Sequence, residues 1–263
     1  MADIPAVDPT VPHNARVWNY WLGGKDNYAS DRALGDQMAE FVPVFPQMAR
    51  ASRAFLRRAI TYLAAEAGIR QFLDVGTGLP SEGNTHEVAQ AIAPDARIVY
   101  VDNDPLVLAH ARALLTSTPE GATQYAHVDA RAPEEVLAAA GVTLDFERPV
   151  AVTMLSVLHF FDDEEVRRTV GTIMDAVPSG SHLAIAHGTY EYSDTVSTAA
   201  LEHWNASTTT PGHPRDRTAL AELALDGLEL LDPGIVSCAR WRAEGAWKDA
   251  PEVPQYGLVA RKP

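Results

Sequence analysis

The chain has 263 residues, of which 46% are hydrophobic and 21% charged, and a formal net charge of −14. These proportions are typical of a globular protein, and the negative charge makes nucleic acids and anionic membrane surfaces unfavourable partners. No apolar run reaches the roughly 18 residues of a membrane-spanning helix, and the start of the chain lacks the features of a signal peptide. Since the single cysteine, Cys238, cannot form an intrachain disulfide, we expect a cytoplasmic protein that acts on a small molecule or another protein.

Residues 1–47 are predicted to form a segment distinct from the core of the domain. They are rich in tryptophan, tyrosine and glycine but have too little periodicity for a continuous helix. Residues 48–263 are predicted to form the core of a single domain, which opens with a helix at 48–67 that Gly68 ends. The arginines of this helix have helical spacing and are interpreted as its solvated face: Arg50, Arg53, Arg57 and Arg58.

After Gly68, apolar strands and helices alternate, as in a parallel sheet that helices cover on both faces. The predicted strands are 71–75, 97–101, 123–128, 149–157 and 181–186. The predicted helices are 87–93, 105–117, 133–140, 162–177 and 218–225. Two further strand-like runs have no crossover helix between them and are expected to pair antiparallel: 235–241 and 255–261. The predicted fold is therefore α/β and Rossmann-like, an open, mostly parallel twisted sheet with a C-terminal antiparallel hairpin.

The first predicted strand leads into a glycine turn, Asp74-Val75-Gly76-Thr77-Gly78. The glycines allow a tight turn and a close approach of a ligand to the backbone. A dinucleotide site has a third glycine where the next helix begins, so that a pyrophosphate can bind there. Here Pro80 and Glu82 occupy that region, and Glu82 would repel a pyrophosphate. Asp74 suits an ammonium group, so the turn favours S-adenosylmethionine over NAD.

Carboxylates also end the second and third predicted strands. Asp102, which Asn103 follows, has the position of the acid that accepts from ribose hydroxyls in Rossmann-type units, although it could instead cap the next helix. For Asp104 we favour that cap. Asp129 could accept from the adenine amine while the backbone N–H of Ala130 faces a ring nitrogen. Ligands of such sheets bind beyond the carboxyl ends of the strands, so the three acids are expected to converge there.

Three segments carry a resemblance to a known family: HNARVWNYWLGGKDNY at 13–28 with Asp31-Arg32 after it, FLDVGTGLP at 72–80, and LHF at 158–160. With them the sequence resembles the class I S-adenosylmethionine-dependent methyltransferases. More narrowly, it is similar to an S-adenosyl methyltransferase family that is common in actinomycetes and was long catalogued as a domain of unknown function. The resemblance covers nearly the whole chain and implies about seven strands, bound S-adenosylmethionine and methyltransferase activity. Pro80 departs from the wider superfamily, in which glycine is commoner.

The N-terminal segment is interpreted as a lid over this cofactor, with Tyr20, Lys25 and Tyr28 as its contacts. Aromatic faces attract a cation such as the sulfonium, and Gly23-Gly24 would let the chain turn across it. The alternative is that the aromatic residues only pack the segment onto the domain.

The substrate side of the cofactor is expected after the fourth strand, at Leu155 and Ser156. His159 is the candidate general base, although Phe160 beside it also fits simple packing, and His187 is a weaker candidate. No metal is predicted, because the other histidines lack metal-ligand spacing.

The stretch 189–217 is expected to help shape the acceptor pocket, for a flat or partly apolar substrate. The residues that suggest this are Tyr190, Tyr192, His203 and Trp204. Two other classes of protein stay open: a sensor or scaffold that binds S-adenosylmethionine or its demethylated product without catalysis, and an NAD-dependent oxidoreductase, which the missing third glycine disfavours.

Overall fold

The computed structural model describes residues 8–107, 116–192, 198–208 and 210–263. The strands in these parts of the chain are β1 (Gln71–Val75), β2 (Arg97–Asp102), β3 (Ala122–His127), β4 (Ala151–Leu155), β5 (His182–Gly188), β6 (Glu229–Leu230), β7 (Val236–Ser237) and β8 (Gln255–Arg261). They form one eight-stranded sheet in the order β3-β2-β1-β4-β5-β8-β6, with β7 also paired to β8. β1 to β5 run parallel, and β8 is antiparallel to β5, β6 and β7. The expected sheet type is confirmed, with eight strands instead of about seven.

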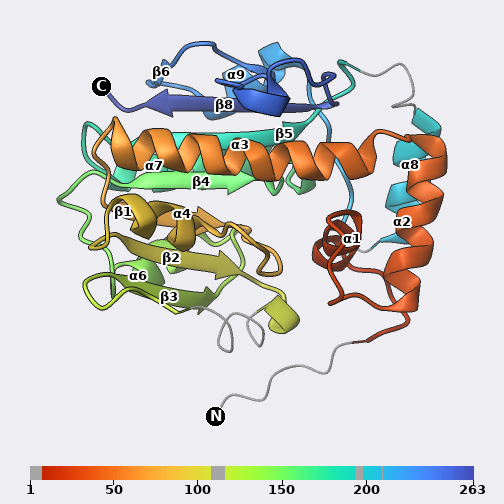
Figure 1. The fold of residues 1–263 in the computed structure, drawn as a ribbon, viewed down its shortest axis with the longest axis horizontal. Coiled ribbons are helices and arrows are strands. Elements are labelled where there is room, and N and C mark those ends of the chain that lie inside the picture. Colours follow the sequence, from red (N-terminus) through yellow and green to blue (C-terminus); the bar gives the residue numbers. More distant parts are fainter. Residues whose placement is uncertain (1–7, 108–115, 193–197, 209) are drawn as a thin grey trace.

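The helices of the described residues surround this sheet (Figure 1). They are α1 (Asn14–Trp21), α2 (Ala29–Phe41), α3 (Phe45–Ala65), α4 (Thr85–Ile92), α6 (Pro133–Ala140), α7 (Asp163–Ala176), α8 (Thr198–Ser207) and α9 (Arg217–Ala224), with short 3-10 turns η1 (Leu158–Phe160) and η2 (Gly245–Trp247). The helices predicted in the core correspond to α3, α4, α6, α7 and α9. The helix predicted at 105–117 begins at Pro105, and its residues 108–115 lie outside the described residues.

Capping groups determine where two of the predicted helices begin. In α7, Asp162 Oδ1 accepts from the Glu165 N–H at 2.8 Å, and Glu165 Oε2 accepts from the Asp162 N–H at 2.9 Å. This reciprocal pair of hydrogen bonds is a capping box. Asp104 Oδ1 accepts from the Leu106 N–H at 2.8 Å, so Asp104 caps the helix after β2 as expected.

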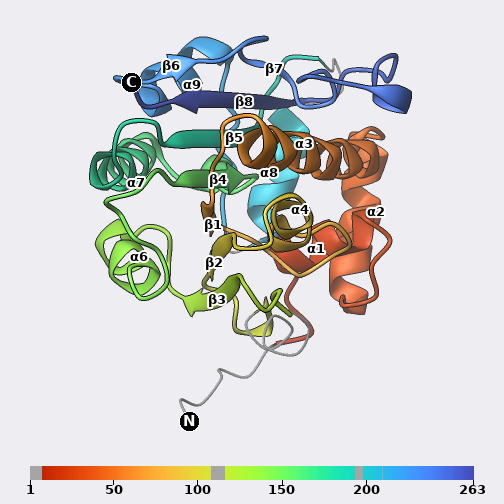
Figure 2. The same cartoon turned by 60° about the vertical axis from the view of Figure 1, so that its left-hand side comes forward.

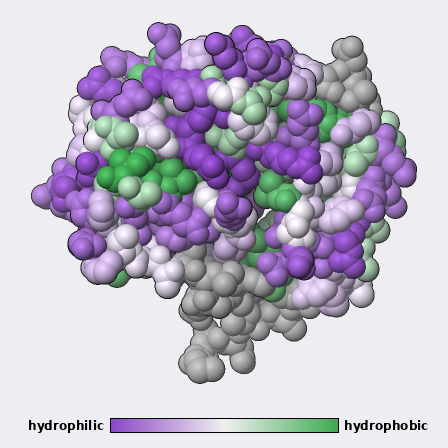
Figure 3. Space-filling view, in the orientation of Figure 1, coloured by the Kyte–Doolittle hydropathy of each residue, from purple (hydrophilic) through white to green (hydrophobic). Residues whose placement is uncertain are grey.

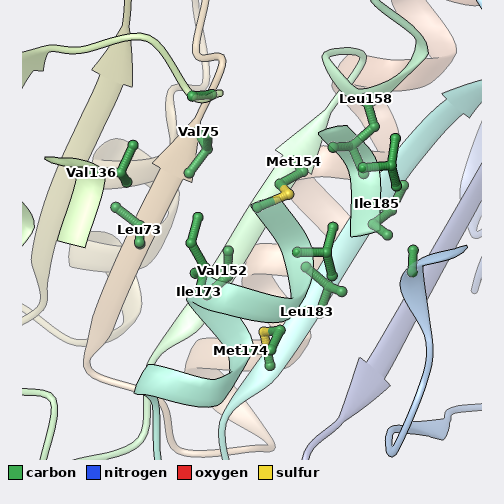
Figure 4. Close-up of a cluster of buried hydrophobic side chains, with 14 of the residues drawn as sticks. Leu73, Val75, Val136, Val152, Met154, Leu158, Ile173, Met174, Leu183 and Ile185 are labelled. Atoms are coloured by element: carbon green, nitrogen blue, oxygen red, sulfur yellow. The ribbon is translucent and has the colours of Figure 1, made fainter. Parts of the chain in front are cut away.

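Helices cover both faces of the sheet (Figure 2). On one face, Leu73 and Val152 pack with Ile173 of α7, within a cluster that Figure 4 shows in close-up. On the other face, Phe72 packs with Phe55 of α3. Neighbouring residues of β1 thus enter opposite cores, because side chains alternate along a strand. Burial on both faces is the reason that these strands are continuously apolar.

The N-terminal segment is helical, contrary to the expectation of a largely unpatterned stretch. α1 and α2 bury polar side chains as well as apolar ones: Arg16 Nε lies 3.0 Å from Asp31 Oδ2, and these side chains are 4% and 0% exposed. Asn19 Oδ1 accepts from the Asp26 N–H at 3.1 Å and from the Asn27 amide at 2.9 Å. Because polar residues occupy buried helix positions, they interrupt the apolar periodicity by which a helix is recognised.

Residues 13–32, the most specific part of the family resemblance, make contacts that stabilise α1, α2 and the loop between them. A Cβ at Gly24 would lie 2.3 Å from the Asn19 side chain, so only glycine allows this approach. Arg32 Nη1 donates to the backbone and side-chain oxygens of Asn27, both at 3.0 Å. These contacts hold the loop between α1 and α2 in place.

α1, α2 and α8 lie beyond the carboxyl ends of the parallel strands, on the right in Figure 1, while α3 runs alongside the sheet from that end. The face drawn in Figure 3 is mostly hydrophilic, with its hydrophobic side chains in small patches. Among the described residues, no helix combines the length and apolar character needed to cross a membrane. The helices at the carboxyl ends of the strands enclose the space in which the site lies.

Candidate functional site

A cavity of about 290 Å³ lies at the carboxyl ends of β1, β2, β3 and β4, facing α1, α3 and α8. Small-molecule sites typically measure roughly 300–1,000 Å³. The cavity brings together the candidate residues at the strand ends: Asp74, Gly76, Thr77, Gly78, Asp102, Asn103, Asp129, Ala130, Leu155, Ser156 and His159. Their convergence follows from the topology, since parallel strands end on one edge of the sheet.

The glycine turn after β1 is built by backbone geometry that other residues rarely adopt. Gly76 has φ +72°, and a Cβ there would lie 2.5 Å from the Cβ of Val157. Gly78 has φ +67°, and its N–H donates to Asp102 Oδ2 at 2.8 Å. The turn and the end of β2 are thereby held together at the floor of the cavity.

Asp102 is fixed by two backbone donors. Its Oδ1 accepts from the Asp104 N–H at 2.9 Å while its Oδ2 accepts from Gly78. Burial raises the pKa of Asp102, and these hydrogen bonds oppose the rise. Each carboxylate oxygen can accept a further hydrogen bond, so Asp102 still has acceptor capacity for a ligand in the cavity.

A second carboxylate, Asp74, is buried where β1 ends, and its Oδ2 accepts from Thr85 Oγ1 at 2.6 Å. Burial raises the pKa of Asp74, whereas the nearby Arg53 guanidinium favours the ionised form. Arg53 also lines the cavity, and its Nη2 donates to the Glu82 carbonyl at 3.1 Å. The two side chains place a carboxyl group and a guanidinium in the same part of the cavity.

The interpretation of the arginines of α3 as a solvated face is wrong for Arg53 and Arg58. Arg58 donates to the carbonyls of Trp241 and Cys238, both at 2.7 Å. The long side chains of both arginines reach from α3 to carbonyls of segments that are remote in the sequence. Cys238 is fully buried, and burial raises the pKa of its thiol to about 12.

At the end of β3, Asp129 is held in a small polar network. Its Oδ2 accepts from Asn103 Nδ2 at 3.1 Å, and its Oδ1 accepts from the Arg131 N–H at 2.9 Å. Its side chain is 45% exposed, and Ala130 next to it is buried. Both residues line the cavity together with Asn103.

The residue after β4, Ser156, has φ +64°, which is uncommon for a residue other than glycine. Its N–H donates to the Ala186 carbonyl at 2.8 Å, and its Oγ accepts from Gln255 Nε2 at 2.7 Å. Strained residues of this kind persist where surrounding contacts enforce them, and they cluster at functional sites. Gln255, from β8, also lines the cavity.

His159 lies on η1, with its ring 4.2 Å from Phe160 and 5.8 Å from His187. Its Nδ1 has no hydrogen-bond partner among the described residues. Burial, and then the positive charge of Arg215, lowers the pKa of His159 to about 3. His159 is therefore a neutral imidazole near pH 7.

In His187, the weaker candidate for a base, both ring nitrogens have hydrogen-bond partners within the protein. Its Nδ1 lies 2.7 Å from the Gly188 carbonyl, and Arg215 Nη1 lies 3.1 Å from its Nε2. Burial holds the pKa of His187 well below its ordinary value. With both ring nitrogens occupied, His187 positions its neighbours.

Arg215 is a buried residue that the sequence did not single out. It donates to the carbonyls of Leu158 at 3.2 Å and Phe161 at 2.7 Å, and it pairs with Asp163 at 2.8 Å. It thereby attaches the loop that carries His159 to the end of β5. No spacing or motif around Arg215 indicates these partners.

The two buried histidines predict a pH dependence of stability. Because the pKa values of His159 and His187 in the folded chain lie below the unfolded value of about 6.5, both take up protons mainly on unfolding, and their contribution is lost as the pH falls below that value. Each should lower the free energy of unfolding by about 1.4 kcal/mol per pH unit between pH 6 and 5. Urea unfolding across this range checks it. His159→Gln should reduce the slope by one histidine's share, and an unchanged slope would contradict the assignment.

The three residues expected to contact the cofactor from the lid lie away from the cavity. Within the described residues, Tyr20, Lys25 and Tyr28 do not line the cavity. Tyr20 donates to Asp36 at 2.6 Å, Lys25 is exposed, and Tyr28 packs under the Arg16 guanidinium at 5.1 Å.

α1 lines the cavity with other residues instead. Asn14, Trp18 and Trp21 are spaced to share one face of the helix, and that face meets the cavity. The helical phase of α1 decides which aromatic residues face inwards. His13, which caps α1, has its Nδ1 3.0 Å from Asp104 Oδ2 and so joins the segment to the loop after β2.

The described part of the stretch 189–217 lines the cavity through α8 and through residues on either side of it. Trp204 is part of the wall. Tyr192 packs against Tyr256 at 5.9 Å, Tyr190 is 46% exposed, and His203 Nε2 lies 3.1 Å from Gln37 Oε1. Among the residues that the structure describes, no three His, Cys, Asp or Glu side chains are grouped so that they could hold a metal ion.

The strand order, the glycine turn and the acids gathered at the strand ends define the Rossmann-like fold of the class I methyltransferases. Human N-acetylserotonin methyltransferase, in complex with S-adenosylmethionine, shares this fold with a TM-score of 0.52 at 13% identity, over 96% of this chain and 63% of that chain. The chain belongs to the S-adenosyl methyltransferase family, whose model matches residues 2–263. It is therefore an S-adenosylmethionine-dependent methyltransferase.

Two solved structures from actinomycetes are similar over almost their whole length. A DUF574 family protein from Streptomyces avermitilis MA-4680 is 42% identical with a TM-score of 0.93, covering 98% of this chain and 100% of that chain. A protein from Thermobifida fusca YX that is assigned as a methyltransferase is 37% identical with a TM-score of 0.87, covering 98% and 97%. No curated protein shows significant similarity to the chain.

Proposed function

We propose that the cavity binds S-adenosylmethionine along the ends of β1, β2 and β3 and presents its methyl group to a small-molecule acceptor beside α1, η1 and α8. The observation that carries this proposal is that one continuous cavity joins the two regions. A binding protein without an acceptor would have no need for the second region. The reaction needs mainly alignment of the acceptor with the methyl group, which bound S-adenosylmethionine supplies as an activated electrophile.

The side chains at the strand ends fit the groups of this cofactor. Asp102 and Asn103 are proposed to bind the ribose hydroxyls, and Asp129 with the N–H of Ala130 to bind the adenine. Gly76, Thr77 and Gly78 would pass close to the methionine part, because the space where a Cβ of Gly78 would lie is open. Leu155 and Ser156 would lie beside the sulfur.

Asp74 and Arg53 fit the two charged ends of the methionine part. Asp74 offers a carboxylate to the ammonium group, and Arg53 offers a guanidinium to the carboxylate. Both line the cavity; Asp74 is buried and Arg53 half-buried, and such interactions are stronger there than in water.

His159 is proposed to orient the acceptor. A conjugate acid with a pKa of about 3 makes the imidazole a weak base, and efficient general bases have pKa values near the working pH. We therefore propose that His159 accepts a hydrogen bond from a hydroxyl or N–H group of the acceptor and does not act as a general base.

The segment 1–47 is proposed as the lid of a single domain whose core is 48–263. α1 supports this because its aromatic face forms part of the cavity wall and His13 joins it to Asp104. A cytoplasmic location without nucleic-acid or membrane partners is proposed from the net charge of −14 and the single, buried Cys238.

Calorimetric titration with S-adenosylmethionine, its demethylated product and NADH tests the proposal. The first two should bind, and Asp102→Ala should weaken both about 10- to 100-fold, because it removes an ionised acceptor from the ribose hydroxyls. Asp95→Ala, an exposed aspartate outside the cavity lining, is the control and should bind like the wild type. Binding of NADH alone, or equal affinities in both variants, would refute the assignment.

A further inference from the structure

The acceptor region of the cavity has a wall of aromatic rings in contact with one another. The ring of Trp21 lies 6.4 Å from that of Trp204, and Trp204 lies 6.2 Å from Phe160 with only 20° between the ring planes. Phe160 in turn lies 4.2 Å from the His159 ring. All four side chains line the cavity. The wall therefore runs from the proposed orienting residue to the N-terminal segment.

Two more rings extend this wall. Phe45 lies 5.3 Å and Trp18 lies 6.0 Å from Trp21, and both also line the cavity. The rings come from α1, α3, η1 and α8, which are far apart in the sequence and meet at the carboxyl ends of the strands (Figure 1). Met38, Met48 and Leu201 add apolar surface to the lining.

Charged side chains near the wall already have partners. Arg131 Nη2 donates to the Phe160 carbonyl at 2.9 Å, but its guanidinium pairs with Glu165 at 3.0 Å and with Asp129 at 3.4 Å. His159 is neutral because burial lowers its pKa to about 3. A charged acceptor would therefore lose its hydration without gaining a free counter-charge among the described residues of the wall.

We propose that the acceptor is a planar, uncharged aromatic molecule that carries a hydroxyl group. This inference rests on the proposed function of the cavity. The flat molecule stacks on the rings of Trp204 and Phe160, and its O–H donates a hydrogen bond to the neutral imidazole of His159. In the reaction, the hydroxyl oxygen forms the O–CH₃ bond as the CH₃–S bond breaks. The sulfonium becomes a thioether with that electron pair, and the hydroxyl proton is released to water.

Three naphthalene-derived probes of similar size separate shape from charge: 2-naphthol is planar and neutral, decahydro-2-naphthol is saturated and not planar, and 2-naphthoate is planar and anionic. Each probe is titrated into the full chain saturated with S-adenosylhomocysteine, the demethylated product of the cofactor. The affinity of the chain for S-adenosylhomocysteine is measured first. We expect 2-naphthol to bind at least about tenfold more tightly than the other two, because only it can stack and remain uncharged.

Substitutions of Trp204 separate the aromatic ring from its apolar character. Trp204→Leu should weaken 2-naphthol about three- to tenfold, and Trp204→Phe should restore most of the affinity. Trp247→Leu, on η2 and outside the cavity lining, should bind like the wild type. Equal binding of the saturated probe, tighter binding of 2-naphthoate, or no binding of 2-naphthol overturns the inference while S-adenosylhomocysteine still binds. If S-adenosylhomocysteine itself does not bind, the proposed function fails as well.

Discussion

Replacing Gly76 by alanine is expected to abolish cofactor binding and to lower the free energy of unfolding by about 2–4 kcal/mol. The φ of +72° alone costs roughly 1 kcal/mol for a residue with a Cβ, and overpacking adds about 1–3 kcal/mol. The new Cβ would lie 2.5 Å from both the Cβ and a Cγ of Val157, so it would displace the loop that carries Ser156. Urea unfolding and titration with S-adenosylhomocysteine measure the two effects.

Gly68→Ala is the matched control for this experiment. Gly68 has nearly the same backbone angle, φ +71°, but apart from Gly68 and its two chain neighbours no described residue has an atom within 4 Å of a Cβ built there. It follows α3 and lies outside the lining of the site cavity. The free energy of unfolding of this variant should fall by about 1 kcal/mol, and its affinity for S-adenosylhomocysteine should equal that of the wild type. If both variants were equally destabilised, the contact with Val157 would not be the cause.

Replacing Asp31 by alanine is expected to destabilise the chain by about 3–5 kcal/mol, because it leaves the buried Arg16 guanidinium unpaired. The carboxylate also accepts from the N–H groups of His13 at 2.9 Å and Tyr28 at 2.8 Å. In a chain of this size the loss corresponds to a fall in Tm of about 10 °C if unfolding is cooperative. Trypsin should then cleave the N-terminal segment first, and the affinity for S-adenosylhomocysteine should fall with it.

Asp36 provides the control on the same helix. It is exposed and accepts a hydrogen bond from the Tyr20 hydroxyl at 2.6 Å. Asp36→Ala should change the free energy of unfolding by no more than about 0.5 kcal/mol. A loss as large as that of Asp31→Ala would show that any acidic residue of α2 matters, whatever its burial.

The core of the fold could be predicted because its signals are local. α6 begins at Pro133 and is followed by Gly141, and its bounds agree with the predicted 133–140. β1 agrees with the predicted 71–75, since the apolar run ends at Gly76. The strand predicted at 149–157 is shorter, because the chain leaves the sheet at Ser156, whose left-handed backbone no sequence pattern indicates.

The N-terminal helices and α8 could not be predicted for a different reason. In α1 and α2 the buried positions include Arg16, Asn19 and Asp31. Arg16 and Asp31 bind each other, and Asn19 binds the loop between the two helices, instead of facing water. A helix is predicted from the spacing of apolar residues, so a segment whose buried positions are polar is predicted as a loop. In α8, only Ala200 is buried, and the remaining contacts depend on rings from elsewhere in the chain.

The candidate site divides in the same way. The acids of the strand ends could be predicted to converge, because a parallel sheet places them on one edge whatever the side-chain detail. The residues of α1 that face the cavity depend on the phase of a helix that was not predicted. Arg53 and Arg215 donate hydrogen bonds to carbonyl groups that are remote in the sequence. Without knowledge of these partners, a charged residue is predicted to face the solvent.

The place of β8 in the sheet has a consequence for how the protein is made. β8 pairs with β5 on one side and with β6 and β7 on the other, although it follows all three in the sequence. During translation, β5 therefore stays an unpaired edge until the ribosome has released residues 255–261. Such an edge can pair with other nascent chains. Gln255, which holds Ser156 at the cavity, arrives with the same strand, so the completed site and a protected sheet edge form in a single late step.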